Sequence, residues 1–283
     1  MPTVLGKLQL SESRQSLSVP ALGQSIPGNG LWLSRGLPLL QTPLLPTFND
    51  ELRTYSRSIL GRLTCQAYVF HQDFYEHQLE QFVEAFVKSP AVATTLEVWR
   101  GHHKAPLGHG ACVERVEEVP CSLTSMAVFR RLYETGVVRE DGNIVRCPDE
   151  YHDHLILDDN LKKVLVKEDG DLWGVLGQED RRQLLVRLFR LVALGGECCQ
   201  FEDNIHHYLA VTRTLYRDLV TPIAEGGQVV VRSVAGQVRV ATAGGGSVPD
   251  DPSHSQNLLL LVINPHAHTL NVLLHQHGVG DMD

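Results

Sequence analysis

Hydrophobic positions along the chain follow two patterns, one typical of strands and one typical of helices. The segment 63–70 (LTCQAYVF) is rich in strand-forming residues. In 77–87 the apolar residues recur every three or four positions, which predicts an amphipathic helix that ends at Pro90. The segment 94–100 then predicts a strand, and the polar run 101–110 predicts a loop.

The middle of the chain predicts further helices with short strands between them. A helix is expected within 122–136, where Gly136 supplies the stop signal. Strands are expected at 143–147 and around 161–166.

Two long helices are expected over 179–196 and 203–220, the second capped by Asp203 or Asn204. Its apolar stripe predicts one buried face. The members of this stripe are Ile205, Tyr208, Leu209, Thr212, Leu215, Tyr216 and Leu219.

The last quarter of the chain predicts two hairpins. The first covers 228–242, with its turn at Ala235 and Gly236, and the second covers 257–276, with its turn around Asn264 and Pro265. Between them, residues 243–256 have the composition of a flexible surface loop. Helices mixed with antiparallel hairpins predict an α+β fold.

The domain organisation follows from a change in composition near Tyr55. Residues 1–54 are rich in Ser, Pro, Gly and Leu, so we expect a partly disordered N-terminal arm. An organelle transit peptide is the alternative for this acid-poor, Ser-rich segment. Residues 55–283 are expected to form a single α+β domain.

Charge and composition narrow the class of partner. The chain has 33 acidic and 25 basic residues, so the basic face that nucleic-acid binding requires is not evident. The longest aliphatic run, 258–263, is far shorter than a membrane span, and we expect no membrane contact. Six cysteines, with Cys198 and Cys199 adjacent, favour reduced thiols in the cytosol.

Two clusters have residue types that bind metals, but their spacing is unsuitable. Cys198, Cys199, His206 and His207 form adjacent pairs, whose side chains point apart, whereas zinc ligand pairs are spaced by two to four residues.

The C-terminal histidines form two pairs. The first, His266 and His268, is expected at the hairpin tip, roughly 23 Å along the strand from the second, His275 and His277. We therefore expect these histidines to be solvated strand-end residues rather than metal ligands.

Catalytic signatures are not found in the sequence. Phosphate-binding glycine loops, a nucleophile elbow and an H-E-x-x-H pair do not occur. The acid pairs Asp158–Asp159 and Glu117–Glu118 are interpreted as ordinary solvated carboxylates. We expect no catalytic residue, no metal site and no cofactor.

Four stretches in order resemble one family: GRLTCQAYVFHQDF (61–74), VPCSLTSMAVFRRLY (119–133), LGGECCQFED (194–203) and the terminal HGVGDMD. With these gaps, residues 31–283 resemble the cilia- and flagella-associated protein 300 family. The chain departs from the family pattern at Ser122, Val128 and His277, in the GGG loop, and in its long N-terminal arm.

The resemblance implies a non-enzymatic factor of motile cilia in the cytoplasm and the ciliary axoneme. It implies a role in the assembly or delivery of outer and inner dynein arms. The implied partners are dynein-arm assembly factors and the intraflagellar transport machinery. A stable axonemal building block is one alternative, and an enzyme or metal-binding module without a local motif is another.

The end of the chain is the candidate partner-binding segment. It consists of Gly278, Val279, Gly280, Asp281, Met282 and Asp283. The two glycines end the strand pattern, and the two aspartates with the terminal carboxylate give three negative charges beside one apolar side chain. A basic groove can bind such an end. The alternative is that the apolar residues fold back onto the sheet.

Overall fold

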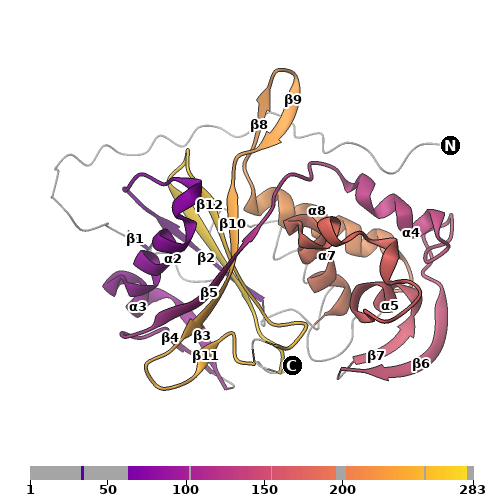
Figure 1. Ribbon diagram of the computed structural model, residues 1–283, viewed down its shortest axis with the longest axis horizontal. Coiled ribbons are helices and arrows are strands. Elements are labelled where there is room, and N and C mark those ends of the chain that lie inside the picture. Colours follow the sequence, from indigo (N-terminus) through magenta and orange to yellow (C-terminus); the bar gives the residue numbers. More distant parts are fainter. Residues whose placement is uncertain are drawn as a thin grey trace.

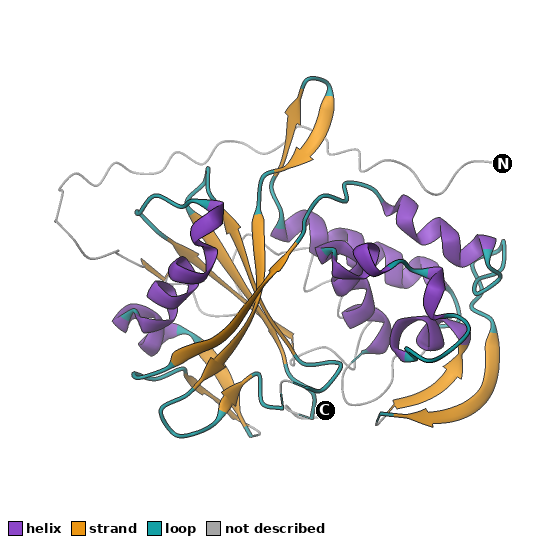
Figure 2. Cartoon of the chain, viewed as in Figure 1, coloured by secondary structure: helices purple, strands orange, loops and turns teal. Residues whose placement is uncertain are grey.

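The structure is a computed structural model that describes residues 33–34, 63–101, 103–153, 155–195, 202–251 and 253–278. A seven-stranded antiparallel sheet forms one half of the molecule, and a group of helices forms the other (Figure 1). Two-stranded hairpins extend from both halves (Figure 2). Helices together with antiparallel strands confirm the predicted α+β class.

The strands come from distant parts of the chain. They are β1 (Leu33–Ser34), β2 (Leu63–Val69), β3 (Glu97–Arg100), β4 (His103–Pro106), β5 (Cys112–Val119), β6 (Arg146–His152), β7 (Leu155–Asp159), β8 (Pro222–Glu225), β9 (Gln228–Val231), β10 (Val234–Ala241), β11 (Ser247–Val248), β12 (Leu258–Asn264) and β13 (Thr269–His275). In the large sheet β1, β2, β13, β12 and β10 are neighbours in that order. Strand β10 also pairs with β11 and, separately, with β5.

The helices are mostly short. The α-helices are α2 (Leu79–Lys88), α3 (Pro90–Thr95), α4 (Arg130–Glu134), α5 (Asn160–Val166), α6 (Gln178–Arg182), α7 (Leu184–Leu194) and α8 (Ile205–Leu219). Single 3-10 turns are η1 (Glu76–Gln78), η2 (Met126–Phe129) and η3 (Trp173–Val175). No described helix combines the length and hydrophobicity that a membrane crossing needs.

Strand β12 is buried on both of its faces. Leu258, Leu260 and Val262 belong to a core shared with α7 and α8. The alternate residues, among them Leu259 and Leu261, belong to a second core shared with α2. Because side chains along a strand alternate between its faces, one apolar run supplies both cores.

Several predicted elements are confirmed. Strand β2, helix α2 and the β12–β13 hairpin lie where the sequence places them. Helix α8 is capped by Asn204, whose side-chain oxygen accepts from the His206 N–H at 3.0 Å. All seven residues of its predicted stripe are buried.

Helix α2 ends at Lys88, before Pro90 as expected, and Pro90 begins the further helix α3, because proline is tolerated at the first helical position. Three predictions between residues 101 and 196 are wrong. The expected loop at 101–110 contains β4, which pairs with β3. The segment 161–166 is helical, since Asp159 caps it by accepting from the Lys162 N–H. The long helix expected over 179–196 is divided into α6 and α7 at Gln183, which is extended.

The expected turn at Ala235 and Gly236 is also wrong. Both residues lie inside β10, where Gly236 pairs with Leu261 of β12 and Glu118 of β5. The hairpin turn lies at Gly226 and Gly227, both with positive φ, which such tight turns require. The flexibility expected at 243–256 stays a prediction; the described part of this segment includes β11 and the buried Gln256.

The α8 stripe generates the first prediction. Leu209 is buried in the core between α8 and the sheet, so Leu209→Ala should lower the free energy of unfolding by about 2–5 kcal/mol. Chemical denaturation measures this change. The matched control is Glu80→Ala on exposed α2 surface, which should change stability by less than about 0.5 kcal/mol. Equal effects of the two substitutions would contradict the packing of this face.

The Tyr216 hydroxyl generates the second prediction. It donates to the Leu123 carbonyl at 2.8 Å and lies 3.2 Å from the Cys121 carbonyl, which ties α8 to the connection after β5. Tyr216→Phe keeps the ring but leaves these partly buried acceptors without the donor, at a cost of about 1–3 kcal/mol. An unchanged denaturation midpoint would show that water replaces the hydroxyl.

Candidate functional site

The predicted tail site begins where the described structure ends. Gly278 is the last described residue and has a φ of 72°. Val279, Gly280, Asp281, Met282 and Asp283 lie outside the described residues. The docking role of this tail therefore stays a prediction.

The C-terminal histidines are not all solvated, and this corrects the sequence interpretation. His275 has no exposed surface, and its Nδ1 lies 2.6 Å from the Gln256 carbonyl oxygen. The loop before β12 covers this end of β13. The ring of His277 stacks on His254 with centroids 4.2 Å apart.

The other candidate metal ligands are separated. His266 is exposed at the β12–β13 turn, and His206 contacts the Tyr133 hydroxyl at 3.1 Å. Cys198 and Cys199 lie outside the described residues. Across the described parts of the chain, no three His, Cys, Asp or Glu side chains gather closely enough to hold a metal ion.

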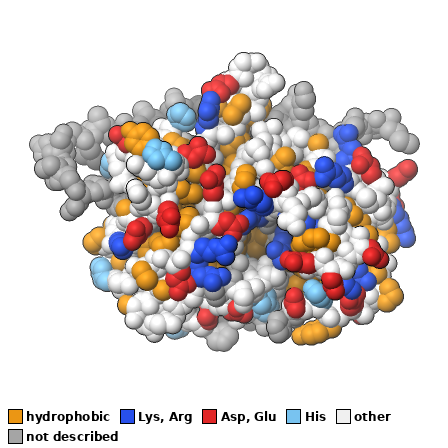
Figure 3. Space-filling view, viewed as in Figure 1, with side chains coloured by type: hydrophobic (Ala, Val, Ile, Leu, Met, Phe, Trp, Pro, Cys, Tyr) orange, Lys and Arg blue, Asp and Glu red, His pale blue; other side chains and the backbone are white. Residues whose placement is uncertain are grey.

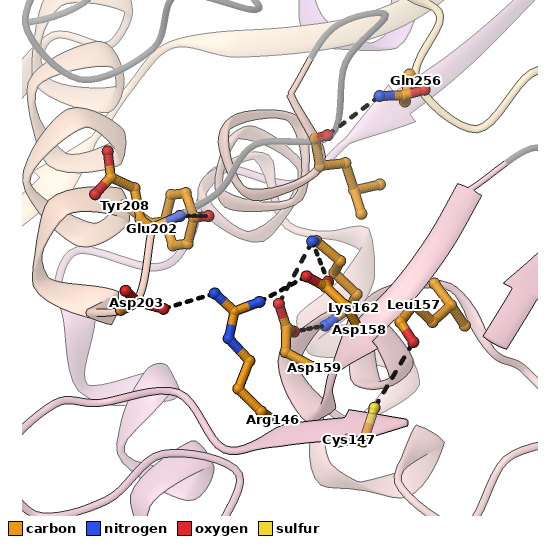
Figure 4. Close-up of polar contacts among 11 residues, drawn as sticks. Arg146, Cys147, Leu157, Asp158, Asp159, Lys162, Glu202, Asp203, Tyr208 and Gln256 are labelled. Carbon is orange, nitrogen blue, oxygen red and sulfur yellow. Dashed lines mark hydrogen bonds and ion pairs between the residues drawn. The ribbon is translucent and has the colours of Figure 1, made fainter. Parts of the chain in front are cut away.

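An ion-pair network joins the β6–β7 hairpin to α5 and to the segment before α8 (Figure 4). Arg146 contacts Asp158 and Asp203, each at 2.6 Å. Lys162, whose side chain is 3% exposed, pairs with Asp158 and lies 3.5 Å from Asp159. The interpretation of Asp158 and Asp159 as solvated carboxylates is therefore wrong.

Burial and charge act in opposite directions on these two carboxylates. Burial raises the pKa of Asp159. Burial also opposes the ionisation of Asp158, but the hydrogen bond and charge of Lys162 lower the pKa of that carboxyl. Each charge has an internal partner, so the network acts as a clamp between elements. A helix-cap Asp followed by Lys three residues later is the local signal for it.

A cavity lies between the two halves of the molecule. It has a volume of about 320 Å³ and is bounded by α6, α7, Trp173 and the loop that leads into β12. Four arginines line it: Arg181, Arg182, Arg187 and Arg190. On the face of the molecule drawn in Figure 3, Lys and Arg side chains surround a hollow near the middle.

Two of these arginines also hold the surrounding structure together. The Arg181 guanidinium donates to the carbonyls of Val164 at 2.8 Å and Trp173 at 2.6 Å, and it stacks on the Trp173 ring. Burial lowers the pKa of Arg181 to about 10. Arg187 pairs with Glu117 of β5 and with Gln237 of β10, so Glu117 is not an ordinary solvated acid either.

Sequence reasoning missed this cavity. Its walls come from segments between Leu165 and Leu258, and only the tertiary fold brings them together. The available signal was four arginines within ten residues, on an otherwise apolar helical pattern.

Comparison with known proteins relates this chain to one family. The family model for cilia- and flagella-associated protein 300 matches residues 48–275. A protein of that name from Chlamydomonas reinhardtii is 27% identical over 225 residues, which cover 77% of this chain and 88% of the relative.

A second protein of that name, from Paramecium tetraurelia, is 31% identical over 164 residues, which cover 57% of this chain and 63% of the relative. No solved structure matches the chain. The family match covers most of the chain and includes the described sheet and helices. The chain therefore belongs to the cilia- and flagella-associated protein 300 family.

Proposed function

We propose that this protein is a non-enzymatic factor for the assembly or transport of outer and inner dynein arms, needed for ciliary motility and axoneme organisation. The observation that carries the proposal is the family match over 48–275, because it spans both halves of the fold. Both curated relatives are named for association with cilia and flagella.

The polar clusters support a binding role rather than chemistry. Lys162 and its carboxylate partners neutralise one another, and Arg181 holds backbone carbonyls. The most exposed large apolar side chains include the cross-strand neighbours Tyr151 and Ile156, which are 73% and 49% exposed on the β6–β7 hairpin. An aromatic and an aliphatic side chain together on a hairpin suit contact with another protein.

The proposed partners are dynein-arm assembly factors and the intraflagellar transport machinery. The proposed locations are the cytoplasm, where arms are assembled, and the ciliary axoneme, to which they are delivered. The competing role is that of a stable axonemal component. The two roles differ in how firmly the protein stays on the axoneme.

Disruption of this protein in motile ciliated cells tests the proposed function. Cross-sections by electron microscopy should show outer doublets that lack both outer and inner dynein arms, and the cilia should be immotile. Expression of the wild-type chain should restore the arms. Cilia with both arms and normal beating would contradict the proposal.

The same cells separate the assembly factor from the building block. An assembly factor should be abundant in the cytoplasmic fraction, and detergent with high salt should release its ciliary fraction. A building block stays with the microtubule doublets under those conditions. Retention on the doublets would favour the structural role.

The tail proposal concerns residues 278–283, and it rests on charge. A basic groove on an assembly partner would bind Asp281 and Asp283 and cover Met282. The variant Asp281→Asn with Asp283→Asn should lose partner capture in affinity purification without a change in melting temperature. The control is Asp169→Asn with Asp171→Asn, a pair with the same spacing elsewhere in the sequence. Equal capture by all three proteins would assign the tail no docking role.

A further inference from the structure

The cavity between the two halves has a strong excess of positive charge. No carboxylate lines its walls among the described residues, whereas four guanidinium groups do. Two acids outside the lining pair with cavity arginines. Glu117 is held by Arg187, and Glu179 lies 3.7 Å from Arg182.

Arg190 is the unbalanced member of this set. No hydrogen bond or ion pair joins it to the described residues, and its Nε is shielded from solvent without a partner there. A guanidinium offers five N–H donors in one plane, so this side chain brings unused donors to the cavity wall. A shielded donor without an acceptor is costly.

A second polar atom at the cavity shares this property. The Ser255 hydroxyl is shielded from solvent and has no hydrogen-bond partner among the described residues. Ser255 lies on the loop before β12, whereas Arg190 lies on α7. Unused donors therefore reach the cavity from both halves of the molecule.

Burial and the neighbouring charges act in opposite directions on the pKa of Arg190. Burial lowers the pKa of the Arg190 guanidinium, the exposed Glu168 partly offsets this, and the charge of Arg187 lowers it further. The charge of Arg190 in turn lowers the pKa of Arg181. Like charges that line one cavity favour an anion between them.

We propose that this cavity binds a phosphate group of a small molecule, with Arg190 and Ser255 as its principal donors. A planar guanidinium matches phosphate oxygens with paired hydrogen bonds. The volume of about 320 Å³ lies at the lower end of small-ligand sites. Leu165, Val186 and Leu191 supply apolar walls for the part of the ligand that carries the phosphate.

Inorganic phosphate and pyrophosphate are the probes that test this site on the full chain. At constant pH and ionic strength, replacing chloride by pyrophosphate should raise the melting temperature by about 3–5 °C near one hundred times the dissociation constant. Titration calorimetry gives that constant for each probe. Tighter binding of pyrophosphate than of phosphate is expected, because more oxygens meet the guanidinium groups.

The variant Arg190→Met keeps an unbranched apolar stem and removes the guanidinium with its charge. It should weaken pyrophosphate binding by about tenfold or more, since charge-assisted hydrogen bonds are lost. Without phosphate it should be at least as stable as the wild type, because a partly buried, unpaired charge is gone. The exposed Arg130→Met is the matched control and should bind like the wild type.

Three results would overturn the proposal. Equal melting shifts for the wild type and Arg190→Met would show a general ionic effect, and no difference between pyrophosphate and chloride would show no site. A synthetic peptide of residues 278–283 that displaces pyrophosphate and binds more tightly would assign the cavity to carboxylates. Wild-type dynein arms in cells that carry Arg190→Met leave the proposed function intact, so the two proposals fail separately.

Discussion

Burial of strand β12 on both faces is the constraint on which the rest of the structure depends. A strand whose every residue from Leu258 to Ile263 is buried needs apolar partners on both sides of the sheet. Each buried Leu or Ile side chain contributes about 1.5–3 kcal/mol, so neither face can be left to water. Helix α2 covers one face, and α7 with α8 cover the other. One layer on β12 is therefore α2, from early in the described chain. The other is α7 with α8, from its middle.

The sequence predicts the elements whose signals are local and consistent. Helix α8 has a strict apolar period, an Asn204 cap and a Pro at 222 shortly after its end, and all three agree. The β12–β13 turn has Asn264 and Pro265, and the Asn264 side chain accepts from the N–H groups of His266 and Ala267 at 3.0 Å. Short-range chemistry decides such features, so one sequence is enough to find them.

The wrong predictions occur where one local sequence signal is compatible with two structures. Gly236 signals a turn in the sequence, but in the structure it lies inside β10 and pairs with Leu261 of β12 and Glu118 of β5. The run LKKVLV suits a strand by residue type, yet the Asp159 cap and the pairing of Lys162 with Asp158 make it a helix. In both cases a contact formed in the folded structure decides which element forms. The spacing of residues in the sequence does not predict that contact. The same holds for His275, which the loop around Gln256 buries.

The arginine cavity lies between the helical half and the sheet, beside the end of α7. The α7 helix ends at Leu194, and the Gln256 amide donates to the carbonyls of Leu194 and Gly195 at 3.3 Å and 2.9 Å. Arg190 lies one turn earlier on the same helix, and Ser255 directly precedes Gln256. The end of α7 and the loop before β12 are thus bound together just beside the cavity. An anion held between Arg190 and Ser255 would add a second link to this junction, next to the one that Gln256 already makes. Since β12 carries both cores, the link would strengthen the seam between the helical half and the sheet, where the packing of apolar side chains gives way to charge.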